Sequence, residues 1–378
     1  MKVLGLIVEY NPFHKGHIYH INKSKSLVKA DYTVAIMSGN FVQRGEPATI
    51  NKWKRSEIAL EYGVDLVIEL PFVYSCQSAD YFAKGALKIL SEIGVTDLCF
   101  GSEIGDIEVF KEIAYCIKDH EDEYNHLVKE NMKLGIRYPD ACNKALNALM
   151  NKEIRTPNDL LGLSYVKEIV FNNYDITPHC FKRTNDYHSE ELAEIASATS
   201  IRKALLEGKE ITSYLPHSEL YKNFYTLDMF YPYLRYVLSI TSKEELQEDH
   251  MVDEGIENLL IENIKSSNDM ETFIQSLLSK RYTRPRIQRM IIHILMNNKK
   301  EDIRKAMDID YIRILSMNEK GREYLNIIKK DLNFTLVSNI SRYTHPALDI
   351  ELKAARLLSL IGNEDLDEME RKHIPLRS

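Results

Sequence analysis

The chain has 378 residues, which at roughly 150 residues per domain predicts a second folding unit beside the first. Hydrophobic residues make up 44% and charged residues 28%, close to globular averages, so extended disorder and collagen-like repeats are excluded. Lys and Arg number 49 against 56 Asp and Glu, a formal net charge of −7, which excludes a uniformly cationic nucleic-acid binder but permits a local basic face.

The five cysteines have no CxxC spacing, so the sequence indicates neither a disulfide framework nor a zinc ribbon. The apolar run from Val3 to Val8 is interrupted by Glu9, and no later run approaches the roughly 18 apolar residues of a membrane span. We therefore expect a soluble, cytoplasmic protein without a signal peptide or contact with a membrane.

Short β-branched runs alternate with helical patterns in the first half of the chain. Strands are expected at residues 3–8, 32–37, 65–70, 96–100 and 176–181. Helices are expected at residues 54–62 and 83–94. This alternation predicts an α/β fold with a doubly wound parallel sheet, whose ligands bind beyond the carboxyl ends of the strands.

The strand pattern ends at about Glu207, and amphipathic helices punctuated by prolines are expected from there on. We therefore divide the chain into an α/β domain of residues 1–205 and a mostly helical domain of residues 206–378. The acidic run from Glu364 to Glu370 is expected to be a solvated tail or helix face.

The segment YNPFHKGH, residues 10–17, lies between the first expected strand and an expected helix. A turn of this kind directs backbone N–H groups and the positive end of the helix dipole at an anion such as a polyphosphate. His14 and His17 would share one face of the first helical turn and donate hydrogen bonds to phosphate. Neither GxGxxG nor GxxxxGK[ST] occurs to offer another phosphate site.

Two other interpretations of these histidines stay open. They can be an ordinary surface or capping pair, or, with His20, they can form an HxxHxxH metal cluster. A second segment favours phosphate: residues 197–205, SATSIRKAL, predict a capped helix start with Arg202 in its first turn. Taken alone, this second segment is typical of an ordinary helix cap.

Together the two segments resemble the HxGH nucleotidyltransferase superfamily, which has a late ISSTxIR-type motif; Ala198 departs from that pattern. Longer stretches resemble the bacterial tRNA(Met) cytidine acetate ligase family over essentially the whole chain. These stretches are GLIVEYNPFHKGHIYH, MSGNFVQRGEPA, DLVIELPFVYSCQSADYFAKGA, CFGSE, TPNDLLGLSYVKEI and SKRYTRPRIQRMIIHIL.

This resemblance implies a HUP-like nucleotidyltransferase domain that activates acetate with ATP, releases pyrophosphate and forms acetyl-adenylate. The acetyl group would then pass to the exocyclic amine of the wobble cytidine of elongator tRNA(Met). His14 and His17 would be the catalytic residues, stabilising the α-phosphate without a protein nucleophile. Mg²⁺ is expected on the triphosphate, and no metal ligands of the protein are predicted.

The ATP-binding residues that the resemblance implies are Ile7, Val8, Glu9, Tyr10, Asn11, Pro12, Phe13, His14, Lys15, Gly16, His17, Ile18, Tyr19, His20, Gly101, Asn158, Arg183, Ser200 and Arg202. Gly101 would let the ligand approach the backbone, Asn158 would hold the base or ribose, and Arg183 would bind phosphate. Without the resemblance, Asn158 is an ordinary turn or cap and Arg183 an ordinary exposed cation.

Two further features follow the second expected strand. The loop from Ser38 to Glu46 is either a wall of the acetate and cytidine pocket or a plain connection between strand and helix. Lys52, Lys54 and Arg55 begin the next helix, where the dipole disfavours structural cations, so a role facing phosphate is mildly favoured.

Residues 280–300 supply a local basic block without Asp or Glu. The tRNA-binding residues predicted there are Lys280, Arg281, Arg284, Arg286 and Arg289, with Tyr282 stacking on a base. An ordinary solvated face is the alternative. Two other functions also stay open: a small-metabolite adenylyltransferase, and a tRNA-binding protein without catalysis.

Overall fold

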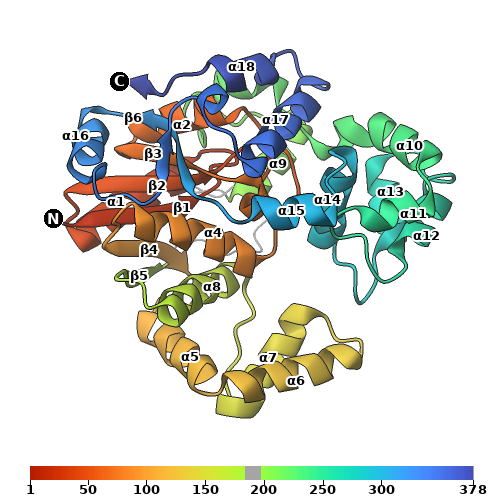
Figure 1. Cartoon of the computed structure of the whole chain (residues 1–378), viewed down its shortest axis with the longest axis horizontal. Coiled ribbons are helices and arrows are strands. Elements are labelled where there is room, and N and C mark those ends of the chain that lie inside the picture. Colours follow the sequence, from red (N-terminus) through yellow and green to blue (C-terminus); the bar gives the residue numbers. More distant parts are fainter. Residues whose placement is uncertain (184–196, 378) are drawn as a thin grey trace.

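The strands form where the sequence has its apolar, β-branched runs (Figure 1). The computed structural model describes residues 1–183 and 197–377. Its strands are β1 (Val3–Val8), β2 (Tyr32–Ser38), β3 (Leu66–Leu70), β4 (Asp97–Ser102), β5 (Thr177–Lys182), β6 (Tyr311–Met317), β7 (Thr335–Val337) and β8 (Leu376–Arg377). All five strands expected in the first half are present, each within two residues of its predicted ends.

The order of the strands in the sheet is β5-β4-β1-β2-β3-β6-β7, with β8 paired to β6. Strands β1 to β5 run parallel to one another, and Leu4 of β1 pairs with Thr33 on one side and Asp97 on the other. The chain moves from β1 outward to β3 and then crosses back to β4. The order therefore reverses between β1 and β4, which is where a doubly wound sheet binds its ligands.

Helices cover both faces of this sheet, as the prediction of a doubly wound fold requires. The helices of the first half are α1 (Lys15–Val28), α2 (Lys52–Glu61), α3 (Phe72–Ser75), α4 (Ala79–Glu92), α5 (Ile107–Asp119), α6 (Glu121–Lys133), α7 (Tyr138–Met150), α8 (Pro157–Asn172) and α9 (Ala198–Leu206). Leu4 and Leu6 are buried in one core with residues of α1, α2 and α9. Val3 is buried in the other core with residues of α4 and α8.

The second half is mostly helical. Its helices are η1 (Ser218–Asn223), η2 (Leu227–Phe230), α10 (Tyr231–Ile240), α11 (Lys243–Glu248), α12 (Ile256–Asn263), α13 (Met270–Leu277), α14 (Arg284–Leu295), α15 (Lys300–Ala306), α16 (Glu319–Ile328), η3 (Ile340–Arg342), α17 (Pro346–Ser359) and α18 (Leu366–Lys372). Helices α10 to α13 form a separate lobe beside the sheet, whereas α16, α17 and α18 return to it (Figure 1).

The expectation that strands end at about Glu207 is wrong. The run YIRILSM forms β6, which joins the edge of the first sheet antiparallel to β3. This strand interrupts a series of helices, so no alternation of strand and helix marks it in the sequence. The division at residue 205 stays a prediction, and the sheet takes strands from both sides of it. Among the described residues, no helix has the length and apolar character to cross a membrane.

Candidate active site

His14 and His17 stand at the turn between β1 and α1. His14 is the N-cap of α1, and the two imidazole ring centroids lie 3.9 Å apart. The backbone N–H of Gly16 donates to Nδ1 of His14 at 3.0 Å, and the N–H of His14 donates to Nδ1 of His17 at 3.2 Å. Because each Nδ1 accepts a hydrogen bond, the neutral form of each ring carries its proton on Nε2.

Burial keeps both rings neutral. It lowers the pKa of His14 to about 3, with Arg183 and Arg202 adding positive potential. Burial, followed by the neighbouring His14, holds the pKa of His17 well below its usual range. The pair therefore presents two fixed Nε2–H donors without adding charge, a geometry suited to oxygens that gain negative charge during a reaction.

The two predicted cations approach the same turn from elsewhere in the fold. Arg202 of α9 donates to the carbonyl oxygen of Asn11 at 2.7 Å and lies 3.7 Å from Glu46. Arg183 follows β5, and its Nε lies 3.8 Å from Glu103, which also accepts from Asn158 at 2.6 Å. A Cβ at Gly101 would lie 3.1 Å from the Arg183 side chain, so β4 and Arg183 are in close contact.

One cavity of about 770 Å³ is lined by His14, His17, Arg183 and Arg202. Of the predicted ATP residues, those that line it are Ile7, Val8, Glu9, Asn11, His14, Gly16, His17, Tyr19, His20, Gly101, Asn158, Arg183 and Arg202. The structure therefore brings together residues from β1, α1, β4, α8 and α9 and the residue that follows β5. A volume of this size is ample for a nucleotide together with a second substrate.

The other predicted ATP residues do not line the cavity: they are Tyr10, Pro12, Phe13, Lys15, Ile18 and Ser200. Tyr10 and Phe13 are fully buried beneath the turn, and Lys15 is exposed. Ser200 is directed at the cap of its own helix, donating to the carbonyl oxygen of Ser197 at 2.9 Å. Ser197 and Thr199 line the cavity in its place.

The loop from Ser38 to Glu46 forms a wall of the cavity through Val42, Gln43, Arg44 and Glu46. Gln43 donates its backbone N–H to Glu9 at 2.8 Å, and burial raises the pKa of that carboxyl. Helix α14 supports the loop from behind. A Cβ at Gly45 would lie 2.3 Å from the backbone nitrogen of Arg289, so only glycine permits this approach.

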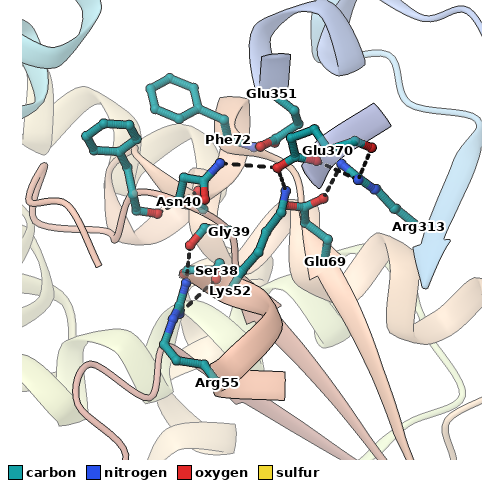
Figure 2. Close-up of polar contacts among 12 residues, drawn as sticks. Ser38, Gly39, Asn40, Lys52, Arg55, Glu69, Phe72, Arg313, Glu351 and Glu370 are labelled. Carbon is teal, nitrogen blue, oxygen red and sulfur yellow. Dashed lines mark hydrogen bonds and ion pairs between the residues drawn. The ribbon is translucent and has the colours of Figure 1, made fainter. Parts of the chain in front are cut away.

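The prediction that Lys52, Lys54 and Arg55 face phosphate is wrong, because carbonyl oxygens and carboxylates hold all three. Figure 2 shows the contacts of Lys52 and Arg55. Arg55 is fully buried and donates to the carbonyl oxygens of Glu9 at 2.6 Å, Ser38 at 3.1 Å and Ile50 at 3.2 Å. Lys54 pairs with Glu364 at 2.6 Å. The cations of α2 therefore hold neighbouring segments of the fold in place.

Lys52 belongs to a buried charge cluster with Arg313, Glu69, Glu351 and Glu370 (Figure 2). Lys52 lies 2.5 Å from Glu69 and also pairs with Glu370, while Arg313 lies 3.0 Å from Glu69 and 2.5 Å from Glu370. The expectation of a solvated acidic tail is therefore wrong for Glu370, which is 1% exposed. The spacing of acids in the sequence could not reveal that α18 packs against the sheet.

The structure places the cations of the basic block, residues 280–300, in different environments. Its cations meet acids from distant segments: Arg284 pairs with Glu271, and both Arg281 and Arg286 lie 3.9 Å from Glu254. Tyr282 is 6% exposed beneath the Arg286 guanidinium, so its ring is not free to stack on a base as predicted. Arg289 lines the cavity and donates to the carbonyl oxygen of Gln43 at 3.1 Å.

The metal interpretation of His14, His17 and His20 finds no support. Over residues 1–183 and 197–377, no group of three His, Cys, Asp or Glu side chains is placed to hold a metal ion. His20 instead packs against Phe181, with ring centroids 5.6 Å apart. Burial lowers its pKa to about 4.

Sequence reasoning missed two acidic residues of the site. Glu103, the last residue of the motif CFGSE, joins Asn158 to Arg183. Asp80 lines the cavity from the start of α4, within the long motif DLVIELPFVYSCQSADYFAKGA. The available signal for Glu103 was its position directly after a strand, and for Asp80 it was its place within a long motif.

Comparison with known proteins agrees with this geometry. The model of the HIGH Nucleotidyl Transferase family matches residues 1–373. The tRNA(Met) cytidine acetate ligase of Bacillus subtilis strain 168 is 42% identical over 407 residues, covering 100% of this chain and 97% of that protein. The enzyme of the same name from Geobacillus sp. strain WCH70 is 40% identical and covers 94% and 93% of the two chains.

Solved structures agree as well. The apo crystal structure of Thermotoga maritima TmcAL superposes with a TM-score of 0.92 at 32% identity, covering both chains completely. The same protein bound with alpha-thio ATP gives a TM-score of 0.91 at 32% identity, over 100% of this chain and 99% of that one. The chain therefore belongs to the tRNA(Met) cytidine acetate ligase family of HIGH nucleotidyltransferases.

Proposed function

We propose that this protein activates acetate with ATP and acetylates the exocyclic amine of the wobble cytidine of elongator tRNA(Met). The observation that carries the proposal is the pair of neutral Nε2–H donors of His14 and His17 in one cavity with Arg183 and Arg202. The names and the full-length coverage of the relatives supply the substrates.

In the first step an acetate oxygen attacks the α-phosphorus of ATP. The bond to the β-phosphate oxygen breaks, and pyrophosphate leaves with the bonding electrons. ATP enters with Mg²⁺ on its phosphates as part of the substrate. The donors of His14 and His17 then stabilise the charge that builds on the α-phosphate oxygens, and the arginines orient the triphosphate.

In the second step the cytidine amine attacks the carbonyl carbon of acetyl-adenylate. The bond from carbon to the adenylate oxygen breaks, AMP leaves with the electron pair, and the nitrogen loses a proton. Cytosine must leave its anticodon stack to reach the cavity. Catalysis by positioning and charge stabilisation suffices here, because acetyl-adenylate is already an activated acyl donor.

The two parts of the chain take different tasks in this proposal. Residues 1–205 carry the ATP chemistry, and residues 206–378 hold the tRNA through Lys280, Arg281, Arg284 and Arg286. The Arg281 side chain is 57% exposed, against 36% for Arg284 and 30% for Arg286. The five cysteines are free thiols, as expected in a reducing cytoplasm, which is where we place the reaction.

The test is incubation with ATP, labelled acetate and total tRNA, followed by nucleoside analysis. The expected product is labelled acetylcytidine in RNA together with AMP and pyrophosphate. Label in a small adenylylated compound that forms without RNA would instead support a metabolite adenylyltransferase. Affinity for RNA without consumption of ATP would support a binding protein.

A further inference from the structure

The cavity extends well beyond the residues implied for ATP. His14, His17 and Arg202 belong to α1 and α9, which cover one face of the sheet, whereas α4 and α8 cover the other. At the far side, Asp80 of α4, Tyr138 of α7, and Ser164 and Lys167 of α8 line the cavity. We call these four residues the Asp80 pocket. None of them is among the residues that the resemblance assigns to ATP.

Asp80 is the acceptor at the centre of this pocket. Tyr138 donates its hydroxyl to Oδ2 of Asp80 at 3.1 Å, and Ser164 donates to Oδ1 at 3.2 Å. Lys167 places Nζ 3.6 Å from Oδ1. A carboxylate has about four acceptor positions, so these partners leave room for a ligand donor. The Asp80 side chain is 41% exposed, which keeps it accessible from the cavity.

Aromatic rings form the walls of the same region. Phe82, Tyr124 and Tyr165 line the cavity and are each less than 10% exposed. Ser164 follows Asn158 by six residues of α8, which is about 9 Å at 1.5 Å per residue. The pocket therefore lies about one nucleoside away from the residue implied for the ATP base or ribose. Its chemistry suits a flat ring that carries an amine beside acceptor atoms.

We propose that the Asp80 pocket binds the cytosine base, with Asp80 accepting a hydrogen bond from the exocyclic amine; this rests on the proposed function above. Cytosine presents that amine beside the acceptors N3 and O2, and an Asp that accepts from the amine is an established mode of recognition. The Lys167 ammonium, which has three N–H donors, supplies donors for these acceptors. Uracil places a carbonyl oxygen opposite the carboxylate and is therefore rejected.

Two half-reactions and one binding measurement test this pocket. Asp80→Asn is compared with Asp119→Asn, an exposed change of equal charge on α5. Acetate-dependent exchange of pyrophosphate into ATP reports acetyl-adenylate formation and correct folding, and acetylcytidine formation reports transfer. We expect Asp80→Asn to lower the ratio of transfer to exchange by about 10- to 100-fold, the size of one base contact. Asp119→Asn should leave the ratio unchanged.

The binding measurement uses labelled anticodon stem-loops with cytidine or uridine at the wobble position. We expect the protein to prefer cytidine and Asp80→Asn to lose that preference, which a purely structural role of Asp80 would not produce. A retained preference and ratio would overturn the pocket alone. A parallel loss of exchange and transfer would place the adenine of ATP there and also overturn it. Absence of exchange in the unaltered protein would instead refute the proposed function.

Discussion

Lys52 and Glu370 form a buried ion pair that joins the first turn of α2 to the last helix of the fold. Their side chains are 0% and 1% exposed, and Glu69 and Arg313 complete their contacts. Asn40 of the cavity-wall loop also donates to Glu370, at 3.3 Å (Figure 2). The cluster therefore fastens the end of the chain to the base of the loop that forms the cavity wall.

Removing the Lys52 ammonium should strongly destabilise the fold. Lys52→Met leaves the carboxylates of Glu69 and Glu370 buried without one of their cations, and breaking such a pair typically costs about 3–5 kcal/mol. Lys54→Met is the matched control, because its partner Glu364 is about one-third exposed and the loss should be about 0–1 kcal/mol. Urea unfolding measures both, and equal midpoints would contradict the assignment.

Glu351 should make stability depend on pH. Burial, with Glu69 adding repulsion, raises the pKa of Glu351 to about 8, so the folded protein keeps a proton that the unfolded chain loses above about 4.5. When Glu351 is protonated, the cluster holds two cations, Lys52 and Arg313, and two carboxylates, Glu69 and Glu370, so its charges balance. The free energy of unfolding should therefore fall as pH rises from about 4.5 to 8, by at most about 1.4 kcal/mol per unit.

The variant that checks this is Glu351→Gln, which keeps an acceptor for the Phe72 N–H but cannot titrate. We expect its unfolding free energy to vary less between pH 5 and 8 than that of the unaltered protein. Glu368→Gln, at an exposed ion pair, is the control. Parallel pH profiles for the unaltered protein and Glu351→Gln would show that Glu351 stays charged in the fold.

The His17 donor should be needed for acetyl-adenylate formation. Loss of one preorganised donor typically lowers a rate about 10²- to 10³-fold, so His17→Ala should reduce acetate-dependent pyrophosphate exchange by that factor. Binding of tRNA should persist, because the proposed RNA contacts lie in the second half. His126→Ala on the exposed side of α6 is the control. Near-normal exchange in His17→Ala would remove this histidine from the catalytic pair.

The fold and the phosphate end of the site were predictable because local signals specify them. Apolar runs locate β1 to β5, and His14 and His17 follow the first of these directly. Contacts between distant segments were not predictable. The sequence does not show that β6 joins β3, that Glu370 meets Lys52, or that Glu254 faces Arg281 and Arg286. Each of these contacts joins residues that are more than 20 positions apart in the sequence. Patterns of local spacing do not describe such contacts.

The cations of the basic block should fall into two classes. Arg289 donates to the carbonyl oxygen of Gln43 and supports the cavity wall, so Arg289→Met should slow acetyl-adenylate formation as well as transfer.

Lys280 and Arg281 are exposed, so Lys280→Ala with Arg281→Ala should weaken tRNA binding and leave pyrophosphate exchange intact. Because each phosphate contact releases counterions, the double variant should also bind with a shallower dependence on salt. Titrations of tRNA at several salt concentrations, beside exchange assays, measure both effects. An unchanged affinity and slope in the double variant would remove these two residues from the RNA surface, whereas normal exchange in Arg289→Met would show that the wall holds without its guanidinium.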